Sequence, residues 1–168
     1  MFVVGILWLL CVLSPIWAFS IEKGEYICVQ STEDLERRKQ QALEKTLQSM
    51  NFLMRSMAES RLTGKPYMCR TYIIEPTENI LRVTCDDKPV IEIRLDGTKT
   101  EYSTKEGSYA SIAKVDERQI FQTFDAGKGG FSVTYIRTEK GFDVVKSIFS
   151  SYLKESLTVR ASYIRKPN

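Results

Sequence analysis

From Tyr67 onward the chain consists of short segments in which apolar and polar residues alternate, and this pattern constrains the fold more than any other feature. Turn-forming pairs such as Asp96-Gly97 separate the segments, together with the glycine-rich stretch 125–130. Alternation with a period of two is typical of β-strands that are buried on one face. The nine predicted strands span residues 67–75, 79–86, 89–95, 98–103, 109–115, 118–124, 131–138, 142–149 and 157–165.

The connections between these segments are short. Short connections join antiparallel neighbours and leave no room for crossover helices. Residues 24–29 supply one more strand candidate. About ten strongly twisted strands in one sheet tend to curl and close, which removes exposed edges. The sequence therefore predicts a mainly β fold, an antiparallel up-and-down barrel of about ten strands; an open curved sheet wrapped on a helix would give the same pattern.

Residues 32–62 form the one long segment with a helical period. Ser31 and Thr32 are suited to cap its start, and Gly64 and Pro66 to end it. A continuous helix of this length would be about 45 Å long at 1.5 Å per residue, which exceeds a small domain. We therefore expect a helical lid with either an overhang or a break, and the weaker helix formers Ser49 and Asn51 favour a break within residues 48–51. Its apolar positions, spaced by three and four, include Ala42, Leu43, Thr46, Met50, Leu53, Met54, Met57 and Ala58.

The N-terminal twenty residues, 1–20, carry no charged side chain and contain an apolar run from Phe2 to Leu13. This is typical of a signal peptide cleaved after Ser20, or alternatively after Ala18. A membrane anchor is the other interpretation, but the run is shorter than a spanning helix and is followed by Pro15. The sequence thus predicts an exported protein, periplasmic or secreted, with one domain over 21–168 and no stable membrane anchor after cleavage.

Charge and composition exclude several classes of function. The net charge is +3 and the basic residues are scattered, so no nucleic-acid partner is predicted. The chain has no histidine, which excludes Ser–His and Cys–His catalysis and histidine metal sites. It also lacks a zinc-like cysteine spacing. We therefore predict no enzyme, no catalytic residues, no metal and no cofactor, and the oligomeric state is left open.

Three cysteines remain after the predicted signal peptide: Cys28, Cys69 and Cys85. If the strands 67–75 and 79–86 form a hairpin centred on Thr77, Cys69 lies opposite Cys85. Opposed β-carbons are close enough for a disulfide after a small adjustment. The alternative is that all three are small buried apolar residues.

The order of elements resembles the fatty-acid-binding-protein branch of the calycin (lipocalin-like) barrels, and small exported bacterial proteins similar to that family. The matching residues are Gly24-Glu25-Tyr26, the helical run 50–58, and the spacing from Leu95-Asp96-Gly97 to Lys105-Glu106-Gly107. The resemblance implies one strand, a helical lid and a meander, with ten strands in all. It does not transfer the family's Arg-x-Tyr carboxylate clamp, because Arg160 and Tyr163 are three residues apart and face opposite sides of a strand.

Candidate ligand-binding residues follow from the alternation. Tyr135 and Tyr163 point inward, and Arg137 and Arg165 continue apolar rows, where a buried cation would suit a ligand anion. The alternative is that both arginines sit at strand ends and reach water. Met54 and Met57 lie with Met50 on the apolar helix face and would form an adaptable portal or simply core.

These observations predict a non-catalytic binding protein for a small hydrophobic or amphiphilic, fatty-acid-like ligand. The alternative is an envelope interaction protein whose barrel is filled by its own side chains and whose outside binds a protein partner. Aromatic residues available to fill such a barrel are Phe121, Phe124, Phe131, Tyr135 and Tyr163. The choice depends on interior volume, because ten strands enclose more space than eight.

Overall fold

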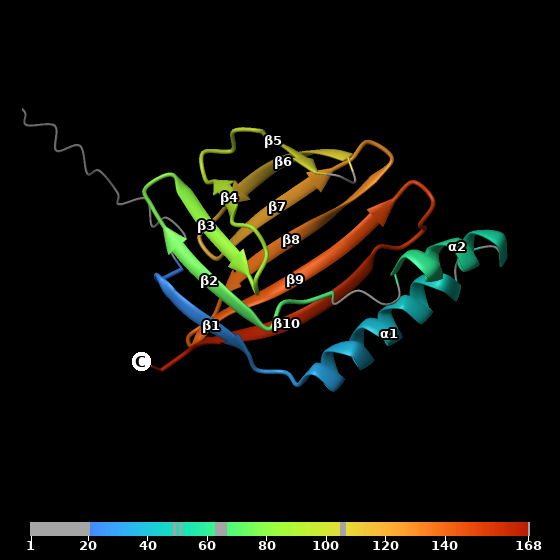
Figure 1. The fold of residues 1–168 in the computed structure, drawn as a ribbon, viewed down its shortest axis with the longest axis horizontal. Coiled ribbons are helices and arrows are strands. Elements are labelled where there is room, and N and C mark those ends of the chain that lie inside the picture. The colour runs from blue at the N-terminus through green and yellow to red at the C-terminus, as the bar shows by residue number, and fades with distance from the viewer. Residues whose placement is uncertain (1–20, 49, 51, 63–66, 105–106, 168) are drawn as a thin grey trace, which may run out of the picture.

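Ten strands form a single antiparallel sheet in the part of the chain that the structure describes, and the sheet curls into a nearly closed barrel (Figure 1). The computed structural model describes residues 21–48, 50, 52–62, 67–104 and 107–167. The predicted signal peptide, 1–20, lies outside these residues. The strands are β1 (Gly24–Cys28), β2 (Thr71–Pro76), β3 (Ile80–Cys85), β4 (Ile91–Arg94), β5 (Thr100–Thr104), β6 (Gly107–Val115), β7 (Gln119–Asp125), β8 (Gly129–Arg137), β9 (Gly141–Ser150) and β10 (Leu157–Arg165).

The strand order is β4-β3-β2-β1-β10-β9-β8-β7-β6-β5. Strands that follow one another along the chain are therefore paired in the sheet, except β4 with β5, and β1 pairs in addition with the last strand, β10. Tyr26 on β1 pairs with Tyr72 on one side and with Arg165 on the other. The seam between β4 and β5 carries no strand pairing, but the Tyr102 hydroxyl on β5 donates a hydrogen bond to the Glu92 carbonyl on β4, at 2.5 Å. The predicted up-and-down barrel is therefore confirmed.

The predicted register of the β2–β3 hairpin is wrong by three residues. The structure pairs Tyr72 with Cys85 and Pro76 with Leu81, so the turn is centred between Glu78 and Asn79 and not on Thr77. The reason is that Thr77 closes the turn: its amide and its hydroxyl both donate to the Ile80 carbonyl. Cys69 thus precedes the strand that was expected to contain it.

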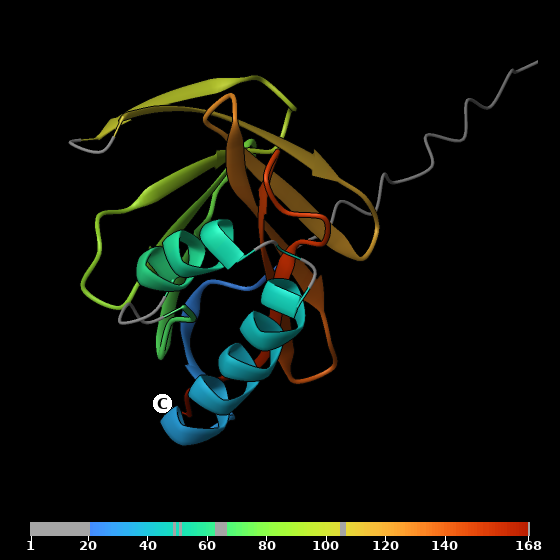
Figure 2. The same cartoon turned by 90° about the vertical axis from the view of Figure 1, so that its right-hand side faces the viewer.

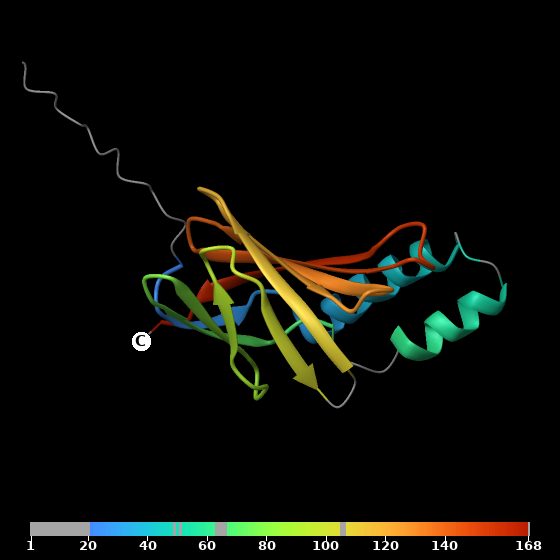
Figure 3. The ribbon, with the colours of Figure 1, turned by 90° about the horizontal axis from the view of Figure 1, so that it is seen from above.

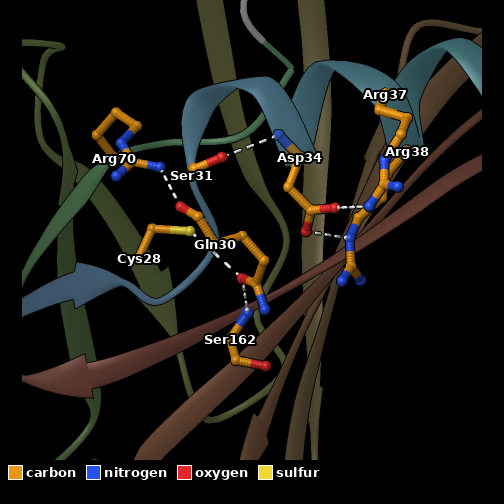
Figure 4. A network of polar contacts seen from close by, with 8 residues as sticks. All are labelled: Cys28, Gln30, Ser31, Asp34, Arg37, Arg38, Arg70 and Ser162. Atoms are coloured by element: carbon orange, nitrogen blue, oxygen red, sulfur yellow. Dashed lines mark hydrogen bonds and ion pairs between the residues drawn. The ribbon is translucent and has the colours of Figure 1, made fainter.

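The helical segment is broken where the sequence predicted. Helix α1 spans Thr32–Gln48 and α2 spans Phe52–Leu62. Figure 4 shows the start of α1, where the Ser31 hydroxyl accepts the Asp34 amide at 3.1 Å and the Asp34 carboxylate pairs with Arg37 and Arg38. Such a cap satisfies a backbone donor that has no partner inside the helix.

Both helices lie at one end of the barrel, as Figure 2 shows by looking at that end, and α2 extends beyond the strands in Figure 3. Helix α1 packs along β10, and its buried Leu43 and Leu47 cluster with Leu157 and Ile148, which face the barrel interior. The apolar stripe of α1 therefore covers the inner face of β9 and β10 where these strands meet the helices.

The opposite end, which we call the base, is filled by aromatic side chains. Phe142 is completely buried and its ring lies 5.4 Å from that of Tyr163 and 4.8 Å from that of Tyr26. Tyr72 packs edge-on against Tyr163 with ring centroids 4.8 Å apart. These rings come from β1, β2, β9 and β10, so the aromatic core fastens together the strands that close the barrel.

Candidate ligand-binding site

Residues 67–70, which lead into β2, have no regular secondary structure and lie against β9 and β10, and we call them the crossing segment (Figure 1). A buried segment of this kind needs partners for its backbone groups. The Tyr163 hydroxyl donates to the Cys69 carbonyl at 2.8 Å, and the Lys146 ammonium donates to the Tyr67 carbonyl at 3.3 Å. The Tyr67 hydroxyl in turn donates to the backbone carbonyls of Lys146 and Leu157.

The C-terminal end of the crossing segment, Arg70, is held by the network of hydrogen bonds shown in Figure 4. Arg70 donates to the Gln30 carbonyl, and the Gln30 side-chain oxygen accepts from the Ser162 amide at 2.8 Å and the Cys28 thiol at 3.5 Å. The junction of β1 with α1 is thereby tied both to β10 and to the start of β2.

A disulfide adds a covalent tie to the same region. It joins Cys69 to Cys85, the pair predicted from the sequence, with their α-carbons 5.5 Å apart. The geometry differs from the prediction, because Cys69 reaches Cys85 from the crossing segment and not from an opposed strand position. Asp86 lies beside the two sulfurs and its carboxylate accepts the amides of Arg70 and Thr71. Sulfurs bonded to each other are not thiolates, so this cluster does not hold a metal.

Lys146 is a cation inside the barrel. It lies on β9 in the row that contains Val144 and Ile148, and it is paired in register with Val133 on β8 and Val159 on β10. Its ammonium lies 4.9 Å from the centre of the Tyr67 ring and 5.3 Å from that of Phe131. In the described part of the chain, the ammonium thus contacts two aromatic rings and one carbonyl oxygen, and it forms no ion pair with a carboxylate.

This environment changes the basicity of Lys146. Burial disfavours the charged form and lowers the pKa of its ammonium from 10.5 to about 8, with a smaller contribution from the charge of Lys88. The two aromatic faces and the Tyr67 carbonyl stabilise a cation only in part. An anion beside the ammonium would offset the remaining cost of burial.

An apolar groove of about 540 Å³ opens between the helices and the ends of β8 and β9, and it begins two residues beyond Lys146 on β9. Ile148, the next inward residue after Lys146 on β9, is part of its wall, so the groove and the ammonium share one face of one strand. Gly129 and Gly130 also line it, and a side chain on Gly130 would collide with the Phe124 carbonyl at 2.0 Å. The other walls are Met50, Ala58, Leu62, Phe149, Ser150, Tyr152 and Leu153.

Two further buried polar side chains, Gln122 and Ser111, lie inside the barrel at the level of Lys146. Gln122 on β7 is paired in register with Val133, which is paired with Lys146, so one row across three strands carries both polar residues. The Gln122 amide nitrogen donates to the Ser111 hydroxyl at 2.9 Å, and both side chains are buried. Its amide oxygen is buried without a partner in the described part of the chain, which costs about 1–3 kcal/mol.

The two tyrosines predicted to face the ligand do point inward. Tyr135 and Tyr163 are both buried, and burial raises the pKa of both hydroxyls well above the usual range. They nevertheless belong to the packed base: the Tyr135 ring lies 6.1 Å from that of Phe142, and Tyr163 holds the crossing segment. Their position favours a structural role at the end of the barrel opposite the groove.

The two predicted arginines lie at the base, and both are exposed. Arg165 pairs with Glu22 at 2.6 Å and donates to the Lys23 carbonyl. With Arg137 it lines a polar cleft of about 220 Å³ on the outside of the base. The structure therefore agrees with the alternative interpretation: both arginines lie at the ends of their strands and are exposed to water, and neither faces the barrel interior.

The structure places some of the methionines predicted to form a portal and the aromatic residues predicted to fill the barrel. The side chains of Met54 and Met57 lie outside the described residues, whereas Met50 lines the groove. Phe124 and Phe131 stack inside with ring centroids 4.4 Å apart. Phe121, expected among the residues that fill the barrel, points outward and is 38% exposed, because β7 buries Ile120, Gln122 and Phe124 instead.

Sequence reasoning missed Lys146. The signal was present in the segment 142–149, where Lys146 interrupts the row Phe142, Val144 and Ile148 at the middle of a strand. A cation in mid-strand cannot reach water as easily as one at a strand end. The sequence argument instead selected Arg137 and Arg165, which the structure places at exposed strand ends.

Comparison with known proteins adds information on the fold. No protein-family model matches the chain, and no curated protein matches its sequence. Among solved structures, a variant of the fluorescent protein UnaG matches with a TM-score of 0.52 and 8% identity over 87% of this chain and 96% of that one. No helix of the described residues is long and apolar enough to cross a membrane.

Fatty-acid-binding proteins are also among the structural neighbours. One from brain tissue of Drosophila melanogaster shares 17% identity over 86% of this chain and 99% of that one, with a TM-score of 0.49. Fatty-acid-binding protein 1 of Echinococcus granulosus shares 13% identity over 86% and 97%, with the same TM-score. The neighbours thus include the group that the sequence resembles, and at these identities the likeness concerns the fold alone.

Proposed function

We propose that this protein is a non-catalytic binding protein for a small acidic amphiphile, such as a fatty acid. The apolar part of the ligand would lie in the groove under the helices, and its anionic head would pair with Lys146. The observation that carries the proposal is an ammonium inside the barrel that has no carboxylate partner in the described residues and lies on the same strand face as Ile148, in the wall of an apolar groove.

Physical chemistry supports each half of this arrangement. Removal of ligand carbon from water contributes roughly 25 cal/mol per Å² of buried apolar area. A carboxylate at Lys146 would supply the counter-charge that the described residues do not, and a charge-assisted hydrogen bond is about twice as strong as a neutral one. The structural neighbours named for fatty acid binding or transport are consistent with this use of the fold.

We also propose that the protein works outside the cytoplasm. Two features support this: the uncharged apolar stretch 1–20, and the disulfide between Cys69 and Cys85. Disulfides persist in oxidising compartments and are rare in the cytosol. Fractionation of cells that express the full chain, with the mature N-terminus sequenced, would test the proposal, and an uncleaved N-terminus in the cytosol would contradict it.

The test of binding compares three proteins: the wild type, Lys146→Met, and Arg137→Met as a matched control at the base. Each is titrated with decanoate and with decanol, which has the same chain length without the charge, by isothermal calorimetry. We expect Lys146→Met to weaken decanoate binding at least tenfold and to leave decanol binding within twofold, whereas Arg137→Met changes neither. Equal loss of both ligands, or no binding to the wild type, would overturn the proposal.

The pH dependence of binding gives a second reading of the same contact. Because the pKa of the Lys146 ammonium in the unliganded protein is about 8, decanoate affinity should fall as the pH rises above 8. Decanol affinity should stay level over the same range, and so should the decanoate affinity of Lys146→Met. A decline that persists in Lys146→Met would show that another group is responsible.

A further inference from the structure

We infer that Lys146 also captures apolar aldehydes covalently, as an imine formed inside the barrel. The inference rests on the proposed function to the extent that the aldehyde would enter by the same groove. It goes beyond it because the bond is covalent and the ligand carries no charge.

The position of Lys146 provides what imine formation requires. Its amine is held by one hydrogen bond to the Tyr67 carbonyl and is flanked by the rings of Tyr67 and Phe131, with Val133 and Val159 on the neighbouring strands. No salt bridge in the described residues engages it, so the nitrogen is not committed to a carboxylate. Its side chain is half-buried, and the next inward residue on β9, Ile148, lines the groove by which an aldehyde would enter.

Apolar surroundings also set the protonation state and the fate of the product. Desolvation lowers the pKa of the Lys146 ammonium to about 8, so at pH 7 about one molecule in ten carries the neutral, nucleophilic amine. Exposed lysines keep pKa values near 10.4, and far less than one in a hundred of them is neutral at that pH. A site that excludes water also slows hydrolysis of the imine.

The reaction balances without any further reactant. The lone pair of Nζ attacks the aldehyde carbon, and the carbonyl oxygen becomes the hydroxyl of a carbinolamine. A carbon–nitrogen double bond then forms, and the oxygen leaves as water together with the two hydrogens that the neutral amine carried. Nothing is oxidised or reduced, and the reverse reaction with water releases the aldehyde.

The test traps the imine. The wild type, Lys146→Arg and Lys128→Arg are incubated with one equivalent of decanal and sodium cyanoborohydride at pH 7, and the products are analysed by intact mass and by peptide mapping. Lys146→Arg keeps the positive charge but removes the nucleophile, and Lys128 is an exposed lysine on the β7–β8 turn. Decanoate binding of each protein is measured in parallel and reports whether the barrel is folded and open.

We expect one decyl group per wild-type molecule, attached at Lys146, at least a tenfold loss of adduct in Lys146→Arg, and no change in Lys128→Arg. If the adduct is spread over exposed lysines, or is equal in wild type and Lys146→Arg, the inference is overturned. Should decanoate still bind in that case, the proposed function stands alone. If neither decanoate nor decanal engages the wild type, both proposals fail.

Discussion

The two ends of the barrel use apolar side chains in opposite ways. At the base, four aromatic side chains are buried against one another, so almost none of their surface is accessible to a ligand: Tyr26, Tyr72, Phe142 and Tyr163. At the helix-covered end, Ile148, Phe149 and Tyr152 line an open groove, and the Lys146 ammonium on the same strand as Ile148 has no counter-charge among the described residues. The difference indicates that stability is concentrated at the base, while the helix-covered end keeps the unsatisfied surface that a ligand needs.

The strongest test of this contrast is Phe142→Ala. Phe142 has no exposed surface and packs against four other rings, so its loss should lower the free energy of unfolding by about 3–5 kcal/mol. Urea denaturation followed by fluorescence measures this. The matched control is Phe121→Ala, which removes an outward ring that is 38% exposed and should cost about 1 kcal/mol or less. Similar losses in both would show that the base is not special.

The disulfide gives the next largest effect. The double substitution Cys69→Ala with Cys85→Ala releases a loop with a sequence separation of 16 residues, and in the chain-entropy model this costs about 3 kcal/mol. Thermal unfolding with and without dithiothreitol measures it: the reductant should destabilise the wild type and leave the double variant unchanged. Since the loss arises in the unfolded chain, decanoate affinity of the folded variant should stay within a few-fold. A larger loss of affinity would show that the crossing segment shapes the groove directly.

Removal of the interior cation should act in the opposite direction. In the folded protein the pKa of Lys146 is about 8 against 10.5 in the unfolded chain, so the unfolded state binds more protons between these values and wild-type stability rises with pH across them. Lys146→Met should therefore be more stable than the wild type by about 3 kcal/mol well below pH 8, and the gain should vanish above about pH 10.5. Denaturation at pH 7 and pH 10.5 would measure it. A stability loss at pH 7 would show that the contacts with Tyr67 and Phe131 outweigh desolvation.

The smallest effect concerns the buried Gln122–Ser111 pair. Because the Gln122 amide oxygen has no partner in the described residues, Gln122→Leu combined with Ser111→Ala removes an uncompensated polar group and should change stability by less than about 1 kcal/mol, or increase it. Ser111→Ala alone leaves the amide nitrogen without its acceptor and should cost about 1–3 kcal/mol. Urea denaturation of the three proteins would distinguish these outcomes. If the double variant loses more than the single one, the oxygen has a favourable interaction in solution.

Much of the fold was predictable because each strand has one buried face. The period of two located all ten strands, and β10 was predicted to its exact ends at Leu157 and Arg165. Length indicated an overhang or a break in the helical segment, and the weaker helix formers Ser49 and Asn51 located the break between α1 and α2. The β2–β3 register was not predictable in the same way, since the hydrogen bonds of Thr77 with Ile80 decide where the turn closes.

The candidate site was harder to predict, because it depends on what lies across the barrel. Alternation placed Tyr135 and Tyr163 inside but did not say that they would pack with Phe142 at the base. For Lys146, the decisive fact is that its partners on the two adjacent strands are valines. In addition, Tyr67 of the crossing segment contacts its ammonium with both a backbone carbonyl and an aromatic ring. These contacts join residues far apart in the sequence.

The pairing of β1 with β10 has a consequence for how the protein is made. Tyr26 and Arg165, which pair in the sheet, lie near opposite ends of the chain. Contacts of such separation form late and slow the folding of a domain, because the whole intervening chain must be ordered first. During synthesis, β1 cannot pair with β10 until β10 has been made. Until then, the edge of β1 and the edge of β9 that pair with β10 remain exposed. A chaperone that covers unpaired strand edges during synthesis would therefore increase the yield of this barrel more than it would for a fold whose first strand pairs only locally.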